Sequence, residues 1–291
     1  MTKKFDRRLL RKLLESGKVT RVPCAYDGFS ARIAQQVGFP VVGFTGNAVS
    51  GSLLGVPDIG ALGLWENVAH AGKIARGLDI PLICDADTGY GGVMNVVRTV
   101  REFEAAGVAA IHLEDQVTPK RCGLLPQGIP VVSREESLAK MRAAVDARES
   151  NDFLIIARTD AASQHGLEEA AARARAYIEV GADAAIVMGA YTPDQLRYVA
   201  EVVRAPLIVV VQEAPPTADL TDELLEKVGC AFTLHAGVAR YAVVKALETA
   251  LGTLRREGTT RDIRGMMATF EEYNVALGLE EWLALESKYD A

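Results

Sequence analysis

Residues 82–92 read Leu-Ile-Cys-Asp-Ala-Asp-Thr-Gly-Tyr-Gly-Gly, a short apolar run that passes directly into carboxylates and glycines. Such a nearly continuous apolar run is typical of a strand in a parallel sheet that is covered on both faces. Asp85 and Asp87 are two residues apart, so their side chains point to the same face if the strand continues. The glycines that follow would let the backbone approach a small ligand closely.

The same pattern recurs along the chain and decides the fold. We expect strands at residues 21–26, 41–45, 82–85, 110–114, 153–158, 184–187, 207–211 and 231–234. Between them lie stretches with apolar residues three and four apart, such as 167–180 and 193–203, which predict helices. Eight strand–helix units without a Pro-, Gly- or Ser-rich linker predict an α/β fold, a single (β/α)8 barrel. A doubly wound open sheet is the alternative.

The chain continues well beyond the last expected strand. A long helix is predicted over 238–256, followed by helices over 266–277 and 280–287. A closed barrel needs only one helix after its last strand. We therefore divide the chain into a barrel domain, residues 1–257, and a C-terminal helical extension, residues 258–291, that packs elsewhere on the barrel or on another subunit.

Composition narrows the class of protein. The chain has 291 residues with 38 acidic and 32 basic side chains, a net charge of −6, which gives little reason to expect nucleic acid or an anionic membrane surface as a partner. No apolar run approaches the roughly 18 residues of a membrane span. The basic start of the chain lacks a following apolar segment, and the four cysteines show no metal-type or redox-type spacing. We expect a reduced, cytoplasmic protein.

Polar residues gather where the expected strands end, which in a barrel is the location of the active site. Seven of the eight expected strands end in polar or ionisable residues, and the sixth, which ends in Met188, is the exception. The polar ends comprise Tyr26-Asp27, Thr45-Gly46-Asn47, Asp85-Ala86-Asp87, Glu114-Asp115, Arg158-Thr159-Asp160, Gln212-Glu213 and His235.

Three of these carboxylates, Asp85, Asp87 and Glu114, end neighbouring strands. Brought together, they would raise at least one pKa unless a cation neutralises them. Mg2+ prefers oxygen ligands and retains waters, so the trio predicts a Mg2+ site, with the ion held directly or through its hydration shell. Mn2+ is not distinguished from Mg2+, and salt-bridged structural aspartates are the alternative.

Arg158 and His112 are the other ionisable residues of these strands. Arg158 follows an apolar run and needs an anion, either Asp160 or the carboxylate of a ligand. We favour the ligand. His112 shares the face of Glu114, but a lone histidine on a strand is more often a hydrogen-bonded core residue, and we leave it outside the site.

One of the four cysteines is expected to be reactive. Cys122 follows Lys120 and Arg121 on a loop, and flanking cations favour the thiolate. The cysteines at positions 24, 84 and 230 sit in or beside apolar strands and are interpreted as small core residues.

Taken together, these motifs closely resemble the isocitrate lyase/phosphoenolpyruvate mutase superfamily. The resemblance is carried by residues 25–32 (Ala-Tyr-Asp-Gly-Phe-Ser-Ala-Arg), 85–91 (Asp-Ala-Asp-Thr-Gly-Tyr-Gly), 112–116 (His-Leu-Glu-Asp-Gln), 119–123 (Pro-Lys-Arg-Cys-Gly) and 156–161 (Ile-Ala-Arg-Thr-Asp-Ala). It implies a (β/α)8 barrel whose terminal helix is exchanged with a neighbouring subunit, in a homo-oligomer that is a dimer of dimers.

The resemblance also implies roles for individual residues. Mg2+ would lie near Asp85, Asp87 and Glu114, with Asp58 beside it. Arg158 and the backbone around Thr45, Gly46 and Asn47 would grip the carboxylate of a 2-oxo acid. The segment from Lys120 to Gly123 resembles the gating loop of the carbon–carbon lyase branch, in which the cysteine acts as acid or base toward the enolate of pyruvate or a similar acid.

Departures from the lyase pattern fall on the part of the site that contacts the rest of the substrate. Leu124 and Met188 replace the usual histidine and glutamate, and 209–213 (Val-Val-Val-Gln-Glu) replaces a polar run that contains asparagine. The changes on strands six and seven resemble the oxaloacetate decarboxylase branch, which lacks the cysteine loop. His235 and Arg240 are candidate replacements for the lost polar contacts.

The sequence therefore predicts a Mg2+-dependent lyase that cleaves a substituted malate or related 2-hydroxy acid and releases pyruvate or another 2-oxo acid. Oxaloacetate-type decarboxylation, phosphorus–carbon chemistry and metabolite binding without turnover are the alternatives. The expected site comprises catalytic Cys122, Lys120 and Arg158, metal-binding Asp85, Asp87 and Glu114, and substrate-binding Tyr26, Thr45, Gly46, Asn47, Asp58, Arg121, Gly123, Met188, Gln212, His235 and Arg240.

Overall fold

Eight parallel strands close into a barrel in the computed structural model, which describes residues 6, 8–122 and 129–289. The strands are β1 (Thr20–Ala25), β2 (Val42–Phe44), β3 (Leu82–Asp85), β4 (Ala110–Glu114), β5 (Leu154–Thr159), β6 (Ala184–Val187), β7 (Leu207–Val211) and β8 (Cys230–His235). Each strand pairs with the next in the chain, and β8 pairs with β1 to close the sheet. The predicted (β/α)8 barrel is confirmed, and the open sheet is excluded.

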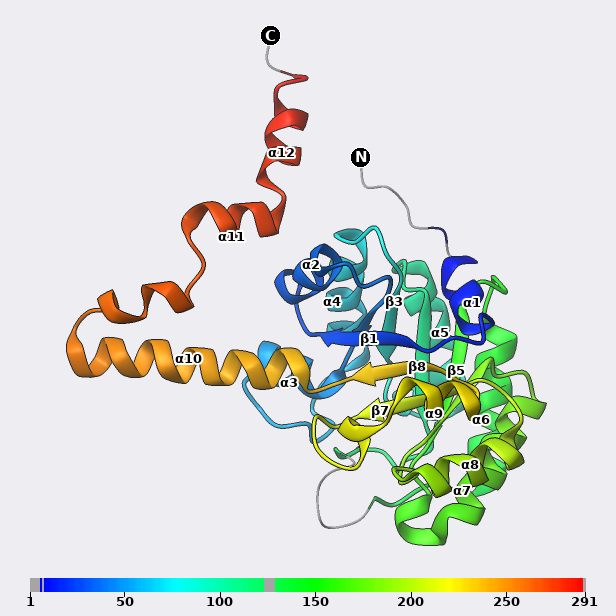
Figure 1. The fold of residues 1–291 in the computed structure, drawn as a ribbon. Helices are drawn as coiled ribbons and strands as arrows, with labels where there is room; N and C mark the ends of the chain where they lie inside the picture. The colour runs from blue at the N-terminus through cyan, green and yellow to red at the C-terminus, as the bar shows by residue number, and fades with distance from the viewer. Residues whose placement is uncertain (1–5, 7, 123–128, 290–291) are drawn as a thin grey trace.

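Helices surround the barrel, as Figure 1 shows. They are α1 (Arg8–Leu14), α2 (Gly28–Val37), α3 (Gly46–Leu54), α4 (Leu64–Arg76), α5 (Val93–Ala105), α6 (Arg134–Ala147), α7 (Ala162–Glu179), α8 (Pro193–Val203) and α9 (Asp222–Lys227), with a 3-10 turn at Thr217–Asp219. No helix in the described part of the chain is long and apolar enough to cross a membrane.

Alternation along each strand separates two cores. On β3, for example, Ile83 packs inside the barrel, whereas Leu82 and Cys84 pack outward against the helices. Asp85 shares the inward parity of Ile83, so the carboxylate follows the apolar interior at its upper end. This alternation decides which strand-end side chains reach the mouth of the barrel.

Two strand boundaries differ from expectation for an identifiable reason. The second strand ends at Phe44, because Thr45 becomes the residue that precedes the first turn of α3. The first strand ends at Ala25, because the Asp27 side chain accepts hydrogen bonds from the backbone N–H and the hydroxyl of Ser30 and begins α2.

The C-terminal helices leave the barrel as an arm (Figure 1). They are α10 (Val238–Glu257), a 3-10 helix (Arg261–Met266), α11 (Phe270–Leu277) and α12 (Leu279–Glu286). The helix expected to begin at residue 266 instead begins at Phe270, because Thr269 forms a capping box with Glu272. The arm touches the barrel again where Gln36 of α2 donates to the Val275 carbonyl at 2.9 Å.

Candidate active site

A cavity of about 80 Å3 opens at the carboxyl ends of the strands. Its lining comprises Thr45, Asn47, Asp58, Asp85, Lys120, Arg121, Cys122, Arg158, Met188, Val210, Val211, Gln212, Ala236, Gly237 and Arg240. A deeper cavity of about 50 Å3 shares Asp85 and Arg158 with it and extends down to Cys24 and His112. Most of the residues predicted from the sequence therefore lie around one space.

Asp85 lies at the centre of this space and is almost fully buried. One carboxylate oxygen accepts from the backbone N–H of Gly46 at 3.2 Å, and the other accepts from that of Asp87 at 3.1 Å. A Cβ on Gly46 would lie 3.0 Å from the Asp85 carboxylate, so a larger residue here would push that carboxylate away. Burial acts to raise the pKa of Asp85, but His112, Lys120 and Arg158 together hold it below its ordinary value.

Lys120 forms a buried bridge between two carboxylates. Its Nζ lies 2.8 Å from Asp87 Oδ1 and 2.9 Å from Asp58, and the side chain is 6% exposed. Burial raises the pKa of Asp87 to about 6 in spite of this contact. Burial opposes the charge of Lys120, but the surrounding carboxylates raise its pKa well above the ordinary value. Lys120 therefore acts as a fixed cation in this structure.

Arg158 contacts Asp160, the alternative to a ligand that the sequence leaves open, and also Glu114. Its Nε and Nη2 donate to the two oxygens of Asp160, each at 2.9 Å, and its Nη1 forms an ion pair with Glu114 at 3.0 Å. A guanidinium has five N–H donors, and the Asp160 contact uses two. Donors on both terminal nitrogens are therefore left for a ligand carboxylate in the cavity.

The three predicted metal-binding carboxylates are close to one another but do not form a direct ligand shell. Over residues 6, 8–122 and 129–289, no three His, Cys, Asp or Glu side chains converge closely enough to hold a metal ion. Within the same ranges, Asp87 Oδ1 and both Glu114 carboxylate oxygens are buried and accept no hydrogen bond of good geometry beyond the ion pairs with Lys120 and Arg158. Such under-used acceptors fit the hydration waters of Mg2+, as in the indirect arrangement of the two predicted.

Cys122 lies at the rim of the cavity and is half-buried. Its backbone N–H donates to the Asp58 carbonyl at 3.2 Å, and its Sγ accepts from Asn47 Nδ2 at 3.3 Å. The Asn47 side-chain oxygen in turn accepts from the guanidinium of Arg240. Arg121 lines the cavity but is largely exposed. Gly123 and Leu124, which the sequence analysis also singled out, lie outside the described residues.

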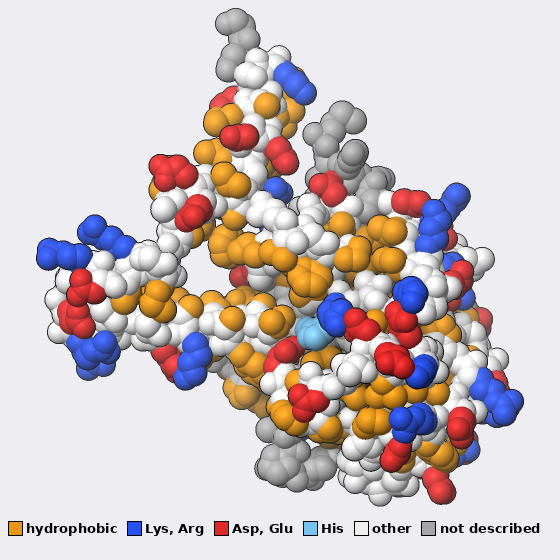
Figure 2. Space-filling view, viewed as in Figure 1, with side chains coloured by type: hydrophobic (Ala, Val, Ile, Leu, Met, Phe, Trp, Pro, Cys, Tyr) orange, Lys and Arg blue, Asp and Glu red, His pale blue; other side chains and the backbone are white. Residues whose placement is uncertain are grey.

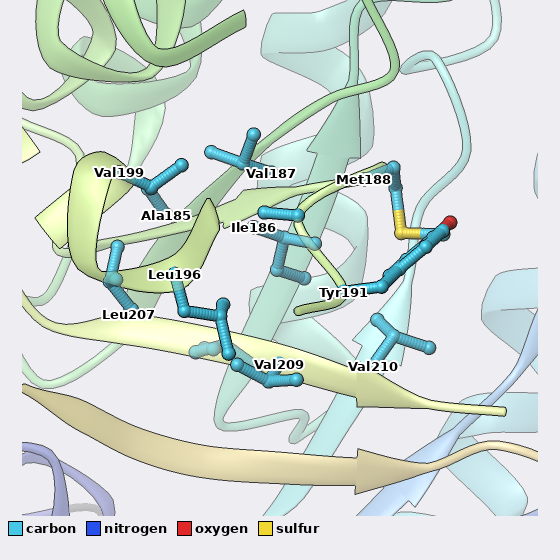
Figure 3. A pocket seen from close by; sticks show the side chains of 12 residues that line it. Ala185, Ile186, Val187, Met188, Tyr191, Leu196, Val199, Leu207, Val209 and Val210 are labelled. Atoms are coloured by element: carbon cyan, nitrogen blue, oxygen red, sulfur yellow. The ribbon is translucent and has the colours of Figure 1, made fainter. Parts of the chain in front are cut away.

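The wall opposite the carboxylates is apolar. Met188 at the end of β6 and Val210 of β7 line the cavity and also the packed space behind it, between these strands and α8. Figure 3 shows the Met188 and Tyr191 side chains pointing toward one another near Val210. Tyr191 was not predicted from the sequence, because it follows the strand by four residues. Gln212 continues the inward face of Val210 and reaches the cavity.

Tyr26 and His235, whose side chains were predicted to bind the substrate, do not line the cavity. His235 shares the outward parity of Thr233, and its ring nitrogens lie 3.3 Å from the Thr233 hydroxyl and 3.2 Å from Glu213. Tyr26 packs with the outer core, and its carbonyl accepts from His70 Nε2 at 2.7 Å. For His235 the alternation of β8 directs the side chain away from the barrel interior, whereas Tyr26 lies beyond the end of β1, where the alternation of the strand no longer applies.

His112, which the sequence analysis left in the core, is part of the site. Its Nδ1 lies 3.4 Å from Asp85 Oδ1, and burial lowers its pKa, so the neutral ring is favoured. The signal was available in the sequence, because His112 and Glu114 share the inward face of β4.

Known proteins resemble this chain over nearly its whole length. A sequence model of the family described as phosphoenolpyruvate phosphomutase matches residues 10–254. The chain is 39% identical over 280 residues to 2,3-dimethylmalate lyase of Eubacterium barkeri, covering 96% of each protein. It also resembles the structure of oxaloacetate acetylhydrolase with 3,3-difluorooxalacetate (TM-score 0.89, 34% identity, 97% and 96% covered). The phosphonopyruvate hydrolase complex with oxalate and Mg2+ is similar as well (TM-score 0.87, 32% identity, 99% of each covered).

Proposed function

Because this chain belongs to the phosphoenolpyruvate phosphomutase family, we propose that it is a carbon–carbon lyase that cleaves a substituted malate by retro-aldol chemistry. The observation that carries the proposal is the placement of the Cys122 thiol in the same cavity as Asp85 and Arg158. This combination offers one group for the substrate carboxylate and another for proton transfer to carbon. The identity to 2,3-dimethylmalate lyase supports it.

The bond changes define what the site must do. The 2-hydroxyl gives its proton to solvent, and C2 becomes the carbonyl carbon of a 2-oxo acid. The electron pair of the C2–C3 bond passes to C3, which forms an enolate with its own carboxylate. A proton delivered to C3 then completes the second carboxylic acid. The enolate in this scheme belongs to the released acid rather than to pyruvate.

Residues at the mouth of the barrel hold the 2-oxo acid end. The free donors of Arg158 bind the substrate carboxylate, together with backbone N–H groups in the first turn of α3, which lack acceptors within the helix. Mg2+ bound near Asp85, Asp87 and Glu114 supplies positive charge that stabilises negative charge on the substrate oxygens. Mn2+ would serve the same purpose.

Cys122 supplies the proton for C3. A thiol is a competent general acid or base near neutral pH, and such a group contributes about 100- to 10,000-fold to rate. Decarboxylation of an oxaloacetate-like acid also leaves an enolate that is protonated at C3, but the 2-oxo group stabilises that enolate. The enolate of a carboxylate, which retro-aldol cleavage forms, is more basic and depends more on a proton donor, so the thiol favours the retro-aldol reaction.

The apolar wall limits the part of the substrate beyond C3. Met188 and Val210 offer no partner to a further carboxylate, and burying an unpaired charge against them is costly. We therefore propose a malate with apolar substituents, of the dimethylmalate kind, over a tricarboxylic acid such as methylisocitrate.

Further expectations from the sequence are retained as proposals. The chain acts as a homo-oligomer, a dimer of dimers with residues 258–291 packed on a neighbouring subunit. Its partner is a small carboxylate, with no nucleic acid or membrane, and its compartment is the cytoplasm.

Proton NMR of the purified protein with Mg2+ tests the reaction. The substrates are 2,3-dimethylmalate, 2-methylisocitrate and oxaloacetate, each with and without a chelator. We expect pyruvate and propionate from 2,3-dimethylmalate, and loss of both products with chelator. Pyruvate from oxaloacetate alone would move the protein to decarboxylation, and oxalate with acetate would indicate hydrolytic cleavage. No products from any substrate would contradict the proposal.

A further inference from the structure

Arg240 is held at the rim of the cavity by two neighbours. It lies in the first turn of α10, and its guanidinium donates to the side-chain oxygen of Asn47. Its Nη2 lies 3.0 Å from the Tyr241 hydroxyl, and its charge lies 4.7 Å from the centre of the Tyr241 ring. These contacts fix the direction of the guanidinium before any ligand binds.

The contact to Arg240 decides which way the Asn47 amide faces. An amide has an acceptor end and a donor end, and the acceptor end faces a group that has only donors. The reversed amide would set two donors against each other. The Nδ2 end therefore points to the other side, where it lies 3.3 Å from Cys122 Sγ.

A donor aimed at sulfur has a chemical consequence. After the thiol has given its proton to carbon, negative charge remains on Sγ, and hydrogen bonds to charged acceptors are stronger than those between neutral groups. The N–H of Asn47 is aligned in advance for that charge, which also leaves the S–H free to point at the substrate.

We propose that Arg240 and Asn47 are positioning residues that act in series to orient Cys122 and to stabilise the charge left on its sulfur. The sequence alone suggested a direct contact of Arg240 with the substrate and a contact of Asn47 through its backbone. The inference rests on the proposed function for its kinetic consequence, but the orientation of the thiol is a property of the protein alone.

Two variants test the Arg240–Asn47 contact and the Asn47–Cys122 contact separately. Arg240→Met removes the charge and the donors, while Asn47→Asp keeps an acceptor for Arg240 but removes the N–H that faces sulfur. Both are expected to lower kcat about tenfold while KM changes less than about threefold. Arg240→Lys should restore part of the loss. Arg255→Met, at the exposed far end of α10, is the matched control.

Reaction of Cys122 with iodoacetamide provides a readout that does not depend on turnover. The other three cysteines are buried. The alkylation rate at Cys122, followed by mass spectrometry at one pH, should fall about tenfold in Arg240→Met and Asn47→Asp and not in Arg255→Met. Thermal melting confirms that each variant is folded. If no substrate turns over but alkylation follows this pattern, the proposed function fails, whereas the orientation of Cys122 by Arg240 and Asn47 is supported.

Three results would overturn this proposal. A rise in KM with unchanged kcat in Arg240→Met would show that Arg240 contacts the substrate. Unchanged alkylation in both variants would show that the thiol does not sense them. In a Cys122→Ala background, Arg240→Met should have no further effect on residual turnover, whereas an additive loss would contradict action through Cys122.

Discussion

At the level of single residues, the charges of the buried cluster that Lys120 and Arg158 form with their carboxylate partners do not balance. Five carboxylates surround two cations, Lys120 and Arg158. The carboxylates are those of Asp58, Asp85, Asp87, Glu114 and Asp160. Buried negative charge without compensation is unfavourable, which is also why burial raises the pKa of Asp87 and Glu114. A divalent cation offsets most of the excess.

Mg2+ is therefore expected to stabilise the fold as well as the reaction. At a hundredfold excess over its Kd, Mg2+ should raise the melting temperature by roughly 5 °C, and a chelator should reverse the shift. Asp85→Asn should abolish the shift, whereas Glu271→Gln, an exposed site on α11, should not. An undiminished shift in Asp85→Asn would place the cation elsewhere.

Replacement of Cys122 tests whether the reaction is retro-aldol cleavage or decarboxylation. Cys122→Ala should lower kcat for retro-aldol cleavage by about 100- to 10,000-fold, because the proton for C3 then comes from solvent. Oxalate binding, measured by calorimetry in the presence of Mg2+, should be unchanged because it needs no proton transfer to carbon. Unchanged turnover would leave decarboxylation as the better assignment.

Met188 is expected to set specificity. Met188→Glu places a carboxylate on the apolar wall and should lower kcat/KM for 2,3-dimethylmalate more than about tenfold, since an unpaired charge there must be desolvated. Met188→Leu, which keeps volume and polarity, should stay within about threefold. Equal effects of the two variants would mean that packing rather than polarity matters at this position.

At the level of helices and strands, one buried carboxylate joins β4, β5 and α7. Asp115 accepts from the Thr159 hydroxyl at 2.7 Å, the Asp160 backbone N–H at 2.9 Å and the Tyr177 hydroxyl at 3.0 Å, and it pairs with Arg173 at 3.2 Å. These contacts fix the end of β5, where Arg158 points in the opposite direction, into the barrel. The contacts of Asp115 outside the barrel thus hold β5, the strand whose Arg158 side chain points into the barrel.

Removal of this carboxylate should destabilise the barrel. Asp115→Ala removes one of the two carboxylates that pair with buried Arg173, and it leaves the hydroxyls of Thr159 and Tyr177 without this acceptor. We expect a loss of about 3–5 kcal/mol in the free energy of unfolding. Tyr177→Phe removes a single hydrogen bond and should cost about 1 kcal/mol. Urea unfolding measures both. A loss below about 1 kcal/mol in Asp115→Ala would show that the network is not a major source of stability.

For the molecule as a whole, α10 carries an apolar face that the described barrel leaves open. The exposed fractions are 50% for Val244, 52% for Leu247, 60% for Leu251 and 46% for Leu254. Their spacing of three and four places them on one side of the helix. Figure 2 shows hydrophobic side chains along this segment and over the helices that follow. Such a face is typical of a surface that a second subunit covers.

Association should therefore depend on this face. Leu247→Glu with Leu251→Glu should dissociate the proposed homo-oligomer, because burial of each leucine contributes about 1.5–3 kcal/mol and a buried glutamate opposes association. Light scattering after size-exclusion chromatography gives the mass. Lys245→Ser, on the polar side of α10, is the control. A monomeric wild-type protein would refute the expected helix exchange.

The barrel, its strand ends and the chemical character of the site could all be predicted from local sequence patterns. Short apolar runs and their polar ends are local properties, so the amino-acid sequence is sufficient to place Asp85, Glu114, Arg158 and Met188 at the mouth of the barrel. The same parity rule, applied further, would also have included His112 and turned His235 outward.

How these side chains pair with one another depends instead on the tertiary fold. Asn47 and Arg240 are 193 residues apart, and they meet because β8 closes against β1 and α10 begins beside α3. Likewise, Lys120 joins Asp58 to Asp87, and Arg158 of β5 pairs with Glu114 of β4. Contacts of this kind depend on register and closure of the whole sheet, which no local pattern encodes, because each is made by elements that the chain brings together only when the barrel closes.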